Sequence, residues 1–73
     1  MTLILDNAVV NTDHYGYIYV VDGKLCLGNS VSVIMIDNIP ENALQQIAVA
    51  KAEGKSYLEF DEAVLLLEDN NDA

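Results

Sequence analysis

The sequence contains no Trp and no Arg, and only one Cys, one Pro and one His. A single cysteine, Cys26, cannot form an internal disulfide, which excludes the stapled frameworks of small secreted domains. No apolar run approaches the ~20 residues of a membrane span. The N-terminus lacks the basic start and the cleavage site of a signal peptide. We therefore expect a cytoplasmic location, which would be the host cytoplasm if a phage encodes the chain.

Positive charge is equally scarce. Twelve acidic residues face three basic ones, Lys24, Lys51 and Lys55, which gives a formal net charge of −9. Nucleic acid and anionic membranes should repel such a chain, and basic protein surfaces should attract it. The alternative interpretation is that the acidity only keeps a small apolar protein soluble.

The residue types that carry catalysis are too few to form a site. Asp13 and His14 are adjacent, but no second His and no nearby Ser or Lys nucleophile completes a constellation. Cys26 has no base close to it in the sequence, and a zinc site requires four ligands. Gly-rich phosphate loops are also missing. We expect a protein that is not an enzyme and that uses no metal and no cofactor.

What the chain does contain is apolar residues, which make up 52% of its 73 residues. This share predicts a folded domain, although a chain this short buries only about 60% of its unfolded surface. We expect one domain over residues 1–68. Residues 69–73 should form a frayed acidic tail.

The clearest structural signal is a β-hairpin centred on Asp22-Gly23, a dipeptide typical of type I′ turns. It pairs Val21 with Lys24 and Tyr19 with Cys26. Because strand residues alternate between faces, Leu25 and Leu27 should then lie on one face of the hairpin. The other face should carry Tyr15, Tyr17, Tyr19, Lys24 and Cys26.

The connection after this hairpin, Gly28-Asn29-Ser30, is open to two interpretations. A loop of two residues would place Ser30 and Ser32 beside Leu25 and Leu27. A loop of three residues would place Val31, Val33 and Met35 there instead, so we favour three. This choice adds Ile34 and Ile36 to the tyrosine face, which would then be apolar as well.

The remaining elements are two strands at the start, one helix and one or two strands at the end. "TLILD" and "AVV" predict short strands around a turn, and residues 40–53 predict a helix that ends at Gly54. "SYLEF" predicts a strand. "AVLLL" fits a strand or a short helix, and the acidic residues after it favour a strand. We therefore expect the α+β class, with a small antiparallel sheet of hairpins and one helix on one face.

The acidic residues near the C-terminus are the first candidate site. A row of carboxylates on a rigid strand approaches the charge density of a DNA strand, which is how DNA-mimic inhibitors, many of them small phage proteins, work. The likeness is one of composition, and no motif identifies a family. The alternative is that these acids only protect an edge strand. The candidate partner-binding residues are Glu59, Asp61, Glu62, Glu68, Asp69 and Asp72.

Two hypotheses of function follow. In the first, the protein is an inhibitor or regulator that docks on a basic, nucleic-acid-binding protein. In the second, it is a small subunit that forms a homodimer or larger homo-oligomer through its tyrosine-rich sheet face, because Tyr is enriched at interfaces. The candidate interface residues are Tyr15, Tyr17, Tyr19, Ile34 and Ile36.

Overall fold

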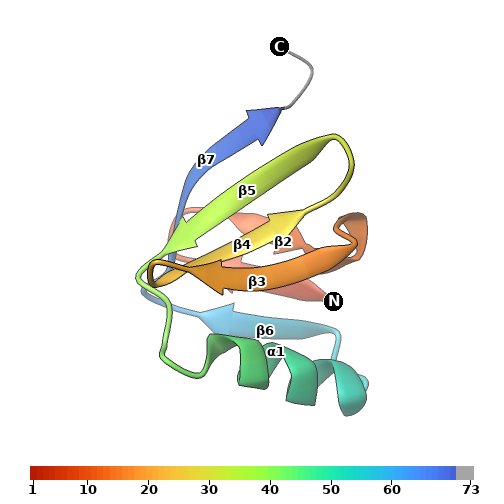
Figure 1. Ribbon diagram of the computed structural model, residues 1–73. Coiled ribbons are helices and arrows are strands. Elements are labelled where there is room, and N and C mark those ends of the chain that lie inside the picture. Colours follow the sequence, from red (N-terminus) through yellow and green to blue (C-terminus); the bar gives the residue numbers. More distant parts are fainter. Residues whose placement is uncertain (71–73) are drawn as a thin grey trace.

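The computed structural model describes the backbone of residues 1–70 and the side chains of residues 1–66. It contains seven strands, one short 3₁₀ helix and one α-helix (Figure 1). The α+β class with a single helix is confirmed. In chain order the elements are β1 (Thr2–Leu5), β2 (Val9–Asn11), η1 (Thr12–His14), β3 (Tyr17–Val21), β4 (Lys24–Gly28), β5 (Ser32–Asp37), α1 (Ala43–Ala52), β6 (Tyr57–Phe60) and β7 (Val64–Asn70).

The strands are divided between two sheets, where the sequence predicted one. The first sheet has the order β2-β1-β6, and the second has the order β3-β4-β5-β7. The second sheet is antiparallel throughout, whereas β1 pairs with β6 in parallel, with Leu3 opposite Leu58. The chain passes from the first sheet to the second between β6 and β7. The "AVLLL" segment is therefore a strand, as its flanking acids indicated.

The predicted hairpin is confirmed in its turn and in its register. Asp22 and Gly23 both have positive φ, at 52° and 74°, as a type I′ turn requires. Val21 pairs with Lys24, and Tyr19 pairs with Cys26.

The predicted register between β4 and β5 is wrong. Leu25 pairs with Ile36 and Leu27 with Ile34, so both isoleucines share the inner face of the sheet with the leucines. Ile34 is 2% exposed and Ile36 is 0% exposed. These two residues belong to the core, and they do not contribute to an outward-facing interface.

The cause of this register is the side chain of Asn29. Its Oδ1 accepts hydrogen bonds from the backbone N–H groups of Val31 and Ser32, both at 2.8 Å. Its backbone N–H donates to the carbonyl of Ser32 at 3.0 Å. Asn29 therefore faces Ser32 across a tip made of Ser30 and Val31, and Ser32 starts β5 on the inner face. Hydrogen bonding in the turn overrides the apolar alternation on which the prediction was based.

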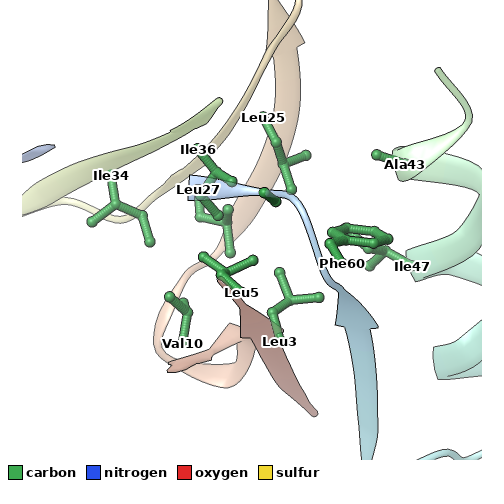
Figure 2. Close-up of a cluster of buried hydrophobic side chains, with 11 residues drawn as sticks. Leu3, Leu5, Val10, Leu25, Leu27, Ile34, Ile36, Ala43, Ile47 and Phe60 are labelled. Carbon is green, nitrogen blue, oxygen red and sulfur yellow. The ribbon is translucent and has the colours of Figure 1, made fainter. Parts of the chain in front are cut away.

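The hydrophobic core lies between the two sheets and the helix. Figure 2 shows side chains from β1, β2, β4 and β5 converging, with the ring of Phe60 beside Ile47 of α1. Full burial of each Leu, Ile or Phe side chain contributes about 1.5–3 kcal/mol. The buried hydrophobic cluster comprises Leu3, Leu5, Val10, Leu25, Leu27, Ile34, Ile36, Ala43, Ile47, Phe60 and Ala63.

The helix begins later than the sequence predicted. Residues 41 and 42 form a turn in which the N–H of Ala43 donates to the carbonyl of Pro40 at 3.1 Å. Ala43, Ile47 and Ala50 face the core, and Gly54 follows the helix with φ of 73°. The ten-residue helix is too short to cross a membrane, and no other helix in the described residues could do so.

Candidate protein-docking surface

Four strands run in the same direction, and an aspartate lies at the C-terminal end of each strand or directly after it. Asp6 follows β1, Asp22 follows β3, Asp37 is the last residue of β5, and Asp61 follows β6. β1 and β6 are parallel, and β3 and β5 are both antiparallel to β4. In Figure 1 the arrowheads of β3, β5 and β6 lie on the same side of the molecule. Four aspartates are thus collected at one end.

Contacts between the loops hold this end together. The N–H of Asp6 donates to the carbonyl of Ala63 at 2.8 Å, which joins the β1–β2 turn to the β6–β7 corner. Asn38 has φ of 58°, and its Nδ2 donates to the carbonyl of Glu62 at 2.9 Å, which joins the end of β5 to the same corner. A shallow depression is lined jointly by residues 39–41 and the β3–β4 hairpin.

Three glutamates lie with these aspartates, and we call the resulting surface the acidic end. Glu59, Asp61 and Glu62 are exposed and line one depression of about 380 Å³ together with Asn38 and Pro40. Phe60 points inward between Glu59 and Asp61, as strand alternation requires. The acidic end comprises Asp6, Asp22, Asp37, Glu41, Glu59, Asp61 and Glu62.

Within residues 1–66, the two acids outside this surface are both paired with a cation. Asp13 accepts a hydrogen bond from the amine of Met1 at 3.1 Å, and Glu53 lies 3.7 Å from the ammonium of Lys55. The hydrogen bond and charge of the terminal amine lower the pKa of Asp13. Within residues 1–66, the seven carboxylates of the acidic end form no such pair. One base, Lys24, lies close to them in the chain.

The structure separates the six predicted acidic residues into two groups and leaves one outside. Glu59, Asp61 and Glu62 belong to the acidic end. Glu68 and Asp69 lie in β7, which starts opposite Asp37 and runs along β5 until Asn70 meets Ser32. Their backbone is therefore carried away from the acidic end. Asp72 lies outside the described residues.

Sequence reasoning missed the other four members of the acidic end. The signal was present, because an apolar strand followed at once by Asp occurs four times, as "TLILD", "YIYVVD", "SVIMID" and "YLEFD". This repeated pattern predicts a shared acidic surface only when the four strands are known to run in the same direction. The missed residues are Asp6, Asp22, Asp37 and Glu41.

The outer face of the second sheet is the other candidate surface. Tyr17 and Tyr19 stack with centroids 6.0 Å apart and are 51% and 38% exposed, beside half-buried Val33 and Met35. Tyr15 departs from the prediction: it precedes β3, is half-buried and packs against the core cluster. The predicted stripe of three tyrosines is thus a pair.

Residues that suggested chemistry are not brought together. His14 is exposed and Cys26 is buried beneath the outer face. Across the described part of the chain, no group of three or more His, Cys, Asp or Glu side chains is arranged to hold a metal ion.

Comparisons with known proteins assign no family. No family model matches the chain, and no significant similarity to a curated protein or to a solved structure is found.

Proposed function

We propose that this protein is a non-enzymatic inhibitor or regulator whose acidic end docks on a basic surface of a nucleic-acid-binding protein. The observation that carries the proposal is the concentration of charge. Seven acids and the neighbouring Lys24 give the acidic end a net charge of −6 (−7 + 1), while Asp13 and Glu53, the other acids within residues 1–66, each lie in an ion pair. A field of one sign attracts oppositely charged partners over about one Debye length, ~8 Å at physiological salt.

The rigidity of the surface supports the same function. The carboxylates sit at strand ends and in loops that are tied together by the Asp6 and Asn38 hydrogen bonds. Carboxylates accept bidentate hydrogen bonds from Arg, as phosphates do. A partner that binds nucleic acid through Arg and Lys would therefore find these acceptors on a backbone that is already ordered, and no loop would have to be ordered on binding.

The experiment compares two variants with the same change in net charge. Asp61→Asn/Glu62→Gln removes two charges from the acidic end, and Asp13→Asn/Glu53→Gln removes two charges from elsewhere. The partner is first captured from the cell that makes the protein, and each dissociation constant is then measured as a function of salt. The first variant should bind at least tenfold more weakly and show a shallower salt dependence, whereas the control should bind within about twofold of the parent chain.

Competition provides an independent test. If the acidic end occupies the groove in which the partner holds nucleic acid, duplex DNA should displace the protein in proportion to its concentration. Equal weakening by both charge variants would show that only net charge matters, and the proposal would then be wrong.

The outer face favours a second candidate function, a homo-oligomeric structural or regulatory subunit. Strand β7 does not cover this face, because it joins the edge of the sheet beside β5. Tyr17 and Tyr19 thus stay exposed on an apolar surface. Sedimentation at high protein concentration tests this candidate, and a strict monomer would remove it.

A further inference from the structure

The free edge of β6 is a second feature of the docking region. β6 is the last strand of its sheet within the described residues. The N–H of Thr2 donates to the carbonyl of Ser56 at 2.9 Å, and Thr2 is paired with Tyr57. Because alternate residues of a strand direct their backbone groups to opposite sides, Leu58 also faces β1. Tyr57 and Glu59 therefore direct their N–H and C=O groups toward the edge.

A groove follows this edge. One depression is lined by five consecutive residues, Lys55 to Glu59. Side chains of consecutive strand residues alternate between the two faces of a sheet, so a single depression lined by all of them runs along the edge.

The helix forms the opposite wall. A neighbouring depression of about 350 Å³ is lined by Leu58 of β6 and by one face of α1, which includes Gln45, Gln46 and Val49. Val49 is 47% exposed. In Figure 1, α1 lies alongside β6. Gln46 and Glu59 also line the depression of the acidic end, which makes the groove continuous with that surface.

We propose that an extended, Lys- or Arg-bearing segment of the partner adds as a strand to the free edge of β6, beside α1. The inference rests on the proposed function and specifies how the partner is bound. Backbone hydrogen bonds to Tyr57 and Glu59 hold the segment in place. Its alternate side chains contact Leu58 and Val49, and a basic side chain at one end reaches Asp61 and Glu62.

Charge selects this occupant over a second copy of the chain. Pairing of two β6 edges would join two molecules that each carry a net charge of −9. Surfaces of like charge oppose association. A basic segment instead reduces the repulsion already present at the acidic end.

The probe is an acetylated nine-residue peptide of alternating Lys and Val, together with two N-methylated forms. One form carries methyl groups on the odd-numbered amides and the other on the even-numbered amides, so charge and length are unchanged. In a bound strand only one of these sets faces β6. We expect one methylated form to bind at least tenfold more weakly than the parent peptide, and the other to bind within about threefold of it.

Amide hydrogen exchange locates the contact. The parent peptide should slow exchange at the amides of Tyr57 and Glu59 at least tenfold. The amide of Leu58, which faces β1, should change little. Failure of the peptide to bind at millimolar concentration, equal binding of both methylated forms, or protection confined to another element would each overturn strand addition.

The Asp61→Asn/Glu62→Gln variant separates the two proposals. If this variant no longer binds the peptide while N-methylation of the peptide does not change its binding, charge-driven docking stands and strand addition is wrong. If methylation weakens binding while this variant binds normally, strand addition stands and the role of the acidic end is wrong. Tyr57→Pro removes one outward N–H and leaves the hydrogen bonds to β1 intact. It should therefore weaken peptide binding severalfold, both in the parent chain and in the Asp61→Asn/Glu62→Gln variant.

Discussion

Neighbouring residues of β5 test the register on which both candidate surfaces depend. Ile36 is fully buried on the inner face, and Met35 is half-buried on the outer face. Ile→Ala in a core costs about 2–5 kcal/mol. Removing a half-buried Met side chain should cost about 1 kcal/mol, since full burial is worth about 1.5–3 kcal/mol. Ile36→Ala should therefore destabilise the fold by at least twice as much as Met35→Ala.

These magnitudes are large for a domain of this size. At roughly 0.05–0.15 kcal/mol per residue, 73 residues have a total stability of about 4–11 kcal/mol. A loss of 1 kcal/mol lowers the Tm of a small domain by about 4–8 °C. We expect Ile36→Ala to lower the Tm by at least about 8 °C, and at the upper end of its range to leave much of the protein unfolded.

Urea denaturation of both variants measures the difference. The midpoints should separate while the slopes stay equal to that of the parent chain, because a changed slope would report an altered denatured state. If Met35→Ala proves more costly than Ile36→Ala, the two residues have exchanged faces. The Asn29 turn would then not set the register, and the outer face would be different from the one described.

The remaining predictions concern charge, close packing and pH. Asp61→Asn/Glu62→Gln should stabilise the fold by about 0.5 kcal/mol at low ionic strength, because repulsion is relieved, and thermal melts should show the gain fading as salt is added. Gly28→Ala should cost about 1 kcal/mol in urea denaturation, because the new Cβ would lie 2.6 Å from the exposed ring of Tyr17, which must move away; an unchanged Tyr17 ring resonance would contradict this. For Asp13, the lowered pKa means that the carboxylate stabilises the fold fully at a pH above its pKa in the unfolded chain. The stability advantage of the parent over Asp13→Asn should therefore be lost as pH falls through the folded pKa, and a pH series of melts that shows a constant difference would refute this.

Local chemistry allowed the β3–β4 hairpin and the helix to be predicted from the sequence. The turn at Asp22-Gly23 needs two residues that accept positive φ, and the dipeptide supplies them. Gly54 ends the helix for a similar reason. Such signals act over a few neighbouring residues, so they can be read without knowing the rest of the fold.

Two other features depend on partners that are distant in the sequence. The parallel pairing of β1 with β6 joins Thr2 to Tyr57, and no turn links them. The side chain of Asn7 also bonds to both backbone groups of Leu65, at 2.8 and 3.1 Å, where β7 pairs irregularly with β5. A pattern within one strand cannot reveal such contacts, because they are chosen by the packing of the whole core.

The acidic end shows a third kind of limit. Three of its members, Glu59, Asp61 and Glu62, could be proposed from the sequence because they are close together in the chain. The other four come from separate strands and loops. Their meeting follows from strand direction, which alternating apolar residues do not encode.

The residue types at the acidic end bear on whether its charge has a function. Aspartate favours turns because its side chain bonds to nearby backbone groups, so the four aspartates at strand ends have a local reason to be there. Glutamate has no such preference, and Glu59 and Glu62 add repulsion that lowers stability. Glu41 directly precedes Asn42, the N-cap of α1, where a negative charge is favourable. Solubility alone would be served equally well by the same charges spread over the surface. Glu59 and Glu62 therefore separate the two interpretations. Their replacement by Gln should leave the turns intact. It should abolish binding to the partner if docking is the function, and should leave this binding unaffected if the charge serves only solubility.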